Sequence, residues 1–122
     1  VVKIQSEIIT NLDEGIIIDC NETYERMFGW PREEIIGRNS LDFTAPESRD
    51  IVAEAIRTHR EGPYEGIGLK KDGTRINTEV SGKKMPYKGK TVRVAAIRDI
   101  TARKLDEERI RASLEEKDVL LK

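Results

Sequence analysis

The chain has 122 residues and a net charge of −1, with hydrophobic and charged residues each making up 37%. This length allows one domain with a small core and is too short for two. No basic stripe interleaved with aromatic residues is present, so the composition argues against a nucleic-acid partner. A single cysteine excludes an intramolecular disulfide, and no apolar run approaches the roughly 18 residues that span a bilayer. We therefore expect a cytoplasmic protein without direct membrane contact.

Two β-branched runs, residues 7–10 and 16–21, flank a turn-rich spacer and predict a β-hairpin at the start of the chain. Asn21 then stands where a helix N-cap is expected, before the amphipathic stretch 22–28. Gly29 fits the position that ends this helix. The first part of the chain is thus predicted as two strands followed by a short helix.

Two more helices are predicted in the middle of the chain. Residues 31–37 place a proline near the helix start, acids in the first turn and a glycine at the end. Thr44 and Glu47 have the spacing of a capping box, which predicts that a third helix opens there. Its apolar stripe continues through the following turns, and we expect the helix to end near Gly62.

After Gly62 the apolar residues alternate with a period of two, which is typical of strands. One strand covers residues 67–69 and the next covers 76–80, and the tight-turn sequence 70–74 connects them. A final strand follows over residues 91–100. Antiparallel strands with helices grouped between them predict an α+β fold.

The final predicted strand is apolar on both faces. Val92, Val94 and Ala96 are expected to fill one face, while Ala95 and Ile97 make the other face partly apolar. An apolar sheet face of this kind requires a cover. We expect the terminal helix or a second subunit to supply it.

Residue types that support catalysis do not form a recognisable set in this sequence. With one His and one Cys, the chain lacks the usual ligands of a zinc site. The stretch 68–75 has the glycine spacing of a phosphate loop, but Thr74 stands where the lysine belongs, so a hairpin turn is the better interpretation. We therefore predict no catalytic residue, no metal site and no enzymatic activity.

His59 and Cys20 are the two residues whose side chains allow more than one interpretation. His59 continues the apolar stripe of the third predicted helix and could ligate a haem iron or sense pH. A histidine in the last turn of a helix also suits a structural role, which we favour. Cys20 ends an apolar strand, and we interpret it as a small hydrophobic residue rather than a redox group.

An apolar seam runs along the charged helix predicted at the end of the chain. The seam has 4-3-4 spacing and consists of Ile110, Leu114, Lys117 and Leu121. A parallel dimer would bury these residues. The alternative is a solvated helix supported by i,i+4 pairs such as Glu107 and Arg111. We favour pairing, because the apolar side chains would otherwise remain in contact with water, and we expect Ile110, Leu114 and Leu121 to form the dimer contact.

Three segments of the sequence resemble a PAS domain. The stretch GIIIDCNETYERMFGWPREEIIGRN resembles the first half of that family, KKDGTRINTEVS its hairpin, and VAAIRDITARK its last strand with the closing Asp-Ile-Thr signature. The match covers about residues 7–104 in the right order. The resemblance implies a five-stranded antiparallel sheet with short helices across one face, a small enclosed cavity, and a C-terminal signalling helix.

The same resemblance implies a sensory module rather than an enzyme. It divides the chain into a PAS domain, residues 1–101, and a signalling or coiled-coil linker helix, residues 102–122. It implies a homodimer that relays a signal to a C-terminal output domain in the same polypeptide, with a sensor histidine kinase of a two-component system as the first expectation. The alternatives are a haem- or flavin-containing sensor of redox state or gas, and a ligand-free dimerisation module of a diguanylate cyclase or another regulator.

The resemblance also implies where the functional residues lie. The relay from sheet to helix is expected at Asp99, Ile100 and Thr101. Thr101 is expected to cap the helix, and Asp99 to pair with Arg98 or Arg103. A cavity for a small-molecule ligand is expected between the helices and the sheet, lined by Tyr24, Phe28, Ile36, Ile56, Ile67, Leu69, Val80 and Val94.

Two departures from the family bear on cofactors. Ser40 and Leu41 occupy the places of the reactive cysteine and the phosphate-binding arginine of flavin-binding members, so flavin photochemistry through a cysteinyl adduct is not expected. In oxygen-sensing haem members the histidine ligand falls earlier in the third helix, near Asp50 and Ile51. His59 comes about two turns too late. The sequence therefore requires no cofactor.

Overall fold

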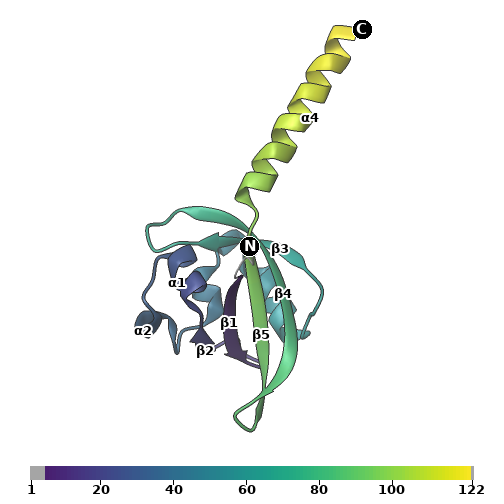
Figure 1. Cartoon of the computed structure of the whole chain (residues 1–122). Coiled ribbons are helices and arrows are strands. Elements are labelled where there is room, and N and C mark those ends of the chain that lie inside the picture. Colours follow the sequence, from purple (N-terminus) through teal and green to yellow (C-terminus); the bar gives the residue numbers. More distant parts are fainter. Residues whose placement is uncertain (1–4, 122) are drawn as a thin grey trace.

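The computed structural model describes residues 5–121, with side chains described as far as residue 116. One antiparallel sheet in the order β2-β1-β5-β4-β3 forms the body of the molecule. Its strands are β1 (Ser6–Asn11), β2 (Ile17–Cys20), β3 (Tyr64–Leu69), β4 (Arg75–Tyr87) and β5 (Lys90–Asp99). The helices are α1 (Glu22–Phe28), α2 (Arg32–Ile35), the 3-10 helices η1 (Ser40–Phe43) and η2 (Pro46–Ser48), α3 (Arg49–Arg57) and α4 (Thr101–Leu121). The predicted α+β fold with a five-stranded antiparallel sheet is confirmed (Figure 1).

The start of α1 is fixed by the predicted cap. The Asn21 side-chain oxygen accepts a hydrogen bond from the amide of Tyr24 at 3.1 Å, which satisfies one of the free donors at the helix N-terminus. The same oxygen accepts from the Glu7 amide of β1 at 3.0 Å, so Asn21 also ties the helix to the sheet. At the other end, Gly29 has a φ of 79° and donates to the carbonyl of Glu25 at 2.8 Å. These local signals set where α1 lies.

The prediction for the third helix is wrong at both ends. Thr44 does not cap it, because its backbone pairs with Gly68 of β3 and its hydroxyl donates to the carbonyl of Ser40 at 3.1 Å. The helix α3 therefore begins only after η2. His59 has a φ of 54°, in the left-handed region, and ends the segment before Gly62 is reached.

The face of β5 that turns toward the helices is not the one that was expected to line the cavity. Arg93, Ala95 and Ile97 are buried and point toward the helices. Val94 lies on the other face, opposite Ile9 of β1, and is only half-buried. The predicted placement of Val94 on the cavity side is therefore wrong. A strand that is apolar on both faces does not show by its pattern which face turns inward.

Helix α4 leaves the sheet directly after β5 and points away from it (Figure 1). It does not fold back over the open face of the sheet, so it is not the cover that an apolar sheet face requires. Among the residues that the structure describes, no helix is both long and apolar enough to cross a membrane.

Candidate functional site

A cavity of about 60 Å³ lies between the helices and the inner face of the sheet. Five of the eight residues predicted to line it do so, and these are Tyr24, Phe28, Ile56, Ile67 and Val80. The other three lie elsewhere. Ile36 packs beside the core outside the cavity, and Leu69 and Val94 are half-buried and do not line it.

Three aromatic rings form the apolar wall of the cavity. The ring centroids of Tyr24 and Phe28 lie 4.6 Å apart. Phe43 meets both rings edge-on, with centroids 5.9 Å from Tyr24 and 6.1 Å from Phe28. The sequence prediction missed Phe43, which comes from η1 rather than from one of the predicted helices. Ser40, at the start of the same short helix, also lines the cavity.

Arg93 is the residue of the cavity wall that sequence reasoning missed most clearly. Its side chain is only 3% exposed, and its Nη2 atom has no hydrogen-bond partner among the described residues. Gly82 on β4 makes room for the guanidinium, since a Cβ at that position would lie 2.4 Å from the Arg93 Cζ atom. An arginine among the apolar residues of an inner strand thus places a positive charge at the cavity.

Tyr64 on β3 also lines the cavity and interacts with Arg93. Burial raises the pKa of the Tyr64 phenol, while the positive charge of Arg93 and a hydrogen bond with its side chain act in the opposite direction. The guanidinium of Arg60 lies over the outer side of the Tyr64 ring, 5.3 Å from its centroid. The cavity lining therefore combines aromatic rings with one buried guanidinium.

Neither haem nor flavin fits this cavity. Its volume of about 60 Å³ is far below the roughly 300–1,000 Å³ of typical cofactor sites. The single histidine of the chain, His59, does not line it and instead places its Nε2 atom 3.0 Å from the Asp13 carboxylate. The single cysteine, Cys20, also lies outside the lining, and burial raises the pKa of its thiol. The side chains that could ligate a haem iron or form a cysteinyl flavin adduct are thus not at the cavity.

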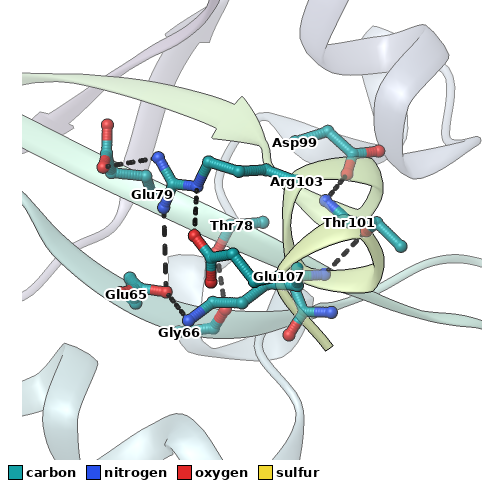
Figure 2. A network of polar contacts seen from close by, with 10 residues as sticks. Glu65, Gly66, Thr78, Glu79, Asp99, Thr101, Arg103 and Glu107 are labelled. Carbon is teal, nitrogen blue, oxygen red and sulfur yellow. Dashed lines mark hydrogen bonds and ion pairs between the residues drawn. The ribbon is translucent and has the colours of Figure 1, made fainter. Parts of the chain in front are cut away.

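The junction between β5 and α4, residues 99–101, is held to β4 by hydrogen bonds (Figure 2). The Asp99 carboxylate accepts from the amide of Thr101 at 2.9 Å. The Thr101 hydroxyl accepts from the amide of Asn77 at 3.1 Å, and the Ile100 amide donates to the Asn77 carbonyl at 2.8 Å. Ile100 is only 3% exposed. These hydrogen bonds and the burial of Ile100 attach the junction to β4.

The predicted roles of two junction residues are reversed. Asp99, not Thr101, accepts from the helix N-terminus, and the Thr101 hydroxyl bonds to the sheet instead. Within residues 5–116, Asp99 forms no ion pair with Arg98 or Arg103. The prediction assumed that an acid next to arginines would pair with one of them, but Arg103 approaches Glu65, Glu79 and Glu107 instead.

The first turn of α4 is joined to two strands by ion pairs, and Figure 2 shows this network. The Lys104 ammonium lies 2.6 Å from the Glu65 carboxylate of β3, and Arg103 lies 3.7 Å from Glu79 of β4. Arg103 also approaches Glu107 within the helix at 3.7 Å. The hydrogen bond between Lys104 and Glu65 lowers the pKa of the carboxyl and raises the pKa of the ammonium group.

The predicted dimer seam of α4 lies open to solvent. Ile110 is 62% exposed and Leu114 is 58% exposed. The side chain of Leu121 lies outside the described residues. Glu107 pairs with Arg103 rather than with the predicted Arg111. The dimer itself stays a prediction, and exposed apolar residues at helical spacing are what it requires.

No set of groups for metal binding is present in the part of the chain that is described. There, no three His, Cys, Asp or Glu side chains lie close enough together to hold a metal ion. The cavity and the α4 junction are therefore the two features on which a function can be based.

Known proteins resemble this chain over most of its length. A family model described as a PAS domain matches residues 6–102. The oxygen sensor protein DosP of Escherichia coli (strain K12) is 34% identical over 113 residues, which cover 85% of this chain and 14% of DosP.

Two solved structures share the fold. The PAS domain of an HTR-like protein from Haloarcula marismortui has a TM-score of 0.67 at 21% identity, covering 79% of this chain and 81% of that chain. The LOV domain from the Erythrobacter litoralis EL346 blue-light activated histidine kinase has a TM-score of 0.66 at 20% identity, covering 82% of this chain and 99% of that chain. With the family match over residues 6–102, these findings show that the chain belongs to the PAS domain family.

Proposed function

We propose that this chain is a sensory PAS module that dimerises through α4 and relays a signal from its cavity to a C-terminal output domain in the same polypeptide. We propose a histidine kinase as that output, because two structures with the same fold come from proteins named as histidine kinases. A diguanylate cyclase or another regulator is the alternative output. The whole protein's activity is a proposal, since the chain spans only 14% of its curated relative's length.

One observation carries this proposal: the strand that lines the cavity also leads into the output helix. Ala95 and Ile97 of β5 line the cavity, and α4 begins at Thr101. A ligand that displaces β5 therefore acts on the helix start over a few residues of extended chain. Packed elements of this kind transmit small shifts as rotations or changes of register of a helix.

The neighbouring strands support the same route. Gly66 and Thr78 line the cavity, and the Thr78 hydroxyl donates to the Gly66 carbonyl at 3.0 Å. The residues next to them, Glu65 and Glu79, belong to the opposite face of the sheet and pair with Lys104 and Arg103 of α4 (Figure 2). Adjacent residues of a strand move together, so a shift of the cavity wall reaches the ion pairs of the helix.

The dimer is tested by placing a charge in the α4 seam. We expect the chain to be a dimer at high micromolar concentration, and Ile110→Lys with Leu114→Lys to be monomeric, because two lysines would face their copies across a parallel seam. Light scattering coupled to size-exclusion chromatography measures the mass. Ala112→Lys is the matched control, since residue 112 lies on the opposite side of the helix. A wild-type monomer, or a double variant that stays dimeric, contradicts the proposal.

Oxygen sensing is the second candidate, because the chain is 34% identical to a protein named as an oxygen sensor. The cavity volume and the place of His59 outside it count against a haem. We expect the purified chain to show no Soret band, even after incubation with haemin. Visible absorption spectroscopy measures this, and a stoichiometric Soret band would restore the oxygen-sensor interpretation.

A further inference from the structure

We propose that the cavity is a binding site for a short monocarboxylate whose carboxylate pairs with the guanidinium of Arg93. This inference rests on the proposed function, in which the cavity receives the signal. It adds the chemical class of the ligand and the residue that recognises it.

The burial of Arg93 is the first argument. Its side chain is 3% exposed, and the Nη2 atom has no hydrogen-bond partner in the described part of the chain. Buried charges are unfavourable unless they are paired and hydrogen-bonded, and an unsatisfied buried group indicates a missing partner. An anion in the cavity would satisfy both requirements.

The neighbours of Arg93 on the sheet do not supply that anion. Thr10 of β1 and Lys84 of β4 lie directly opposite Arg93. The Thr10 hydroxyl already donates to the Asn11 carbonyl at 2.9 Å, and Lys84 is itself positively charged and exposed. Tyr64 of β3 offers Arg93 a side-chain hydrogen bond but no negative charge, because burial raises the pKa of its phenol. Arg93 is thus a buried positive charge in the cavity lining, and its cross-strand neighbours leave the place of a negative partner to a ligand.

The rest of the cavity indicates a carboxylate with an apolar end. A guanidinium matches the two oxygens of a carboxylate with two parallel hydrogen bonds. Phe28, Phe43 and Ile56 also line the cavity, and their side chains suit a hydrocarbon tail. A phosphate would need further donors, and the hydroxyls of Thr44 and Thr78 already donate to backbone carbonyls.

The volume sets the length of the ligand. A water-sized group needs roughly 10–15 Å³ of such space, so a cavity of about 60 Å³ holds only a few non-hydrogen atoms. This corresponds to a carboxylic acid of about two to four carbons, such as acetate, propionate or butyrate. Longer acids exceed the space, and the second carboxylate of a dicarboxylate would lack a basic partner in the lining.

The test is a titration of the whole chain with sodium propionate. Calorimetry measures the affinity, and amide chemical shifts in NMR spectra show which residues respond. We expect saturable binding to the wild type, weakened at least tenfold in Arg93→Met. Arg98→Met, an exposed arginine on the same strand, is the matched control and should bind as the wild type does. Propanol and propylamine, which have the same tail without the carboxylate, should not bind. The fold of each variant is checked from its amide spectrum.

Three outcomes would overturn the inference: propionate does not bind, Arg93→Met binds it equally well, or chloride and sulfate compete as strongly as acetate. In the last case the cavity holds an adventitious ion only. Failure of the proposed function looks different. Propionate would then bind at Arg93, but the amides of residues 99–104 would not shift. Conversely, propanol binding that shifts these amides would leave the sensory function intact and reject the carboxylate.

Discussion

Replacing Arg93 with methionine should raise the free energy of unfolding of the ligand-free chain by about 2–4 kcal/mol, since removing an uncompensated buried charge relieves a cost of that size. The side chain of Arg93 is buried and its Nη2 atom is unsatisfied among the described residues. Methionine keeps a similar length and fills irregular space well. Urea unfolding measures the change as a higher midpoint at unchanged slope, and the melting temperature should rise by on the order of 10 °C.

The control for this prediction is Arg98→Met. Arg98 is exposed on the same strand, so its replacement should change stability by less than about 0.5 kcal/mol. A destabilised Arg93→Met variant would contradict the prediction, because it would mean that packing of the arginine stem outweighs the cost of its charge. A more stable variant that no longer binds propionate would show that the residue is kept for function at the expense of stability.

Asp99→Ala should abolish regulation of the output while leaving the fold intact. The Asp99 carboxylate accepts from the Thr101 amide at 2.9 Å and so fixes the first turn of α4 to the end of β5. Losing such a cap costs about 1 kcal/mol, which a folded domain tolerates. In the protein that carries its output domain, we expect activity with and without ligand to become equal. Autophosphorylation measures this for a histidine kinase.

Asp106→Ala serves as the control for the junction. Asp106 lies one turn further along α4 and its nearest basic partner, Arg109, is 3.9 Å away. Its replacement removes one negative charge close to the junction without touching the junction's hydrogen bonds, and exposed pairs of this kind contribute little. Normal regulation in Asp99→Ala would exclude the junction as the route of the signal. Loss of regulation in both variants would point to the charge of α4 instead.

The parts of the fold that depend on local signals could be predicted from the sequence. Asn21 and Gly29 bracket α1 as expected, since caps act through atoms only a few residues away. The tight turn before Arg75 joins β3 to β4 as expected, because such turns are encoded by their own residues. Helix α4 likewise follows directly from the end of β5.

The wrong predictions concern residues whose positions depend on contacts with residues distant in the sequence. Thr44 has the spacing of a cap, but its backbone pairs with Gly68, more than twenty residues later. Val94 was placed in the cavity because β5 is apolar on both faces, and only pairing with β1 shows which face is inner. Phe43 was missed because a 3-10 helix gives no apolar period to read. These contacts are tertiary, and one sequence does not reveal them.

Arg93 was missed for a different reason. A basic residue between two valines in a strand is ordinarily assigned to the solvent side. Its burial depends on Gly82 of the neighbouring strand, because that glycine supplies the space for the guanidinium. The sequence alone does not show that these two residues are neighbours. The candidate site therefore depends on a residue that violates the binary pattern, as functional positions often do.

The packing of Gly82 against Arg93 has a consequence for how related proteins diversify. A methyl group at position 82 would lie 2.4 Å from Cζ of the arginine, so a larger residue there requires the guanidinium to move, whereas a shorter side chain at 93 leaves Gly82 unhindered. In homologues that carry a larger residue at 82, we expect either another conformation of the arginine at 93 or a shorter residue there, and in both cases a cavity without the guanidinium in this place. Covariation of this pair across an alignment would thus sort the lineage by the charge of what each member detects.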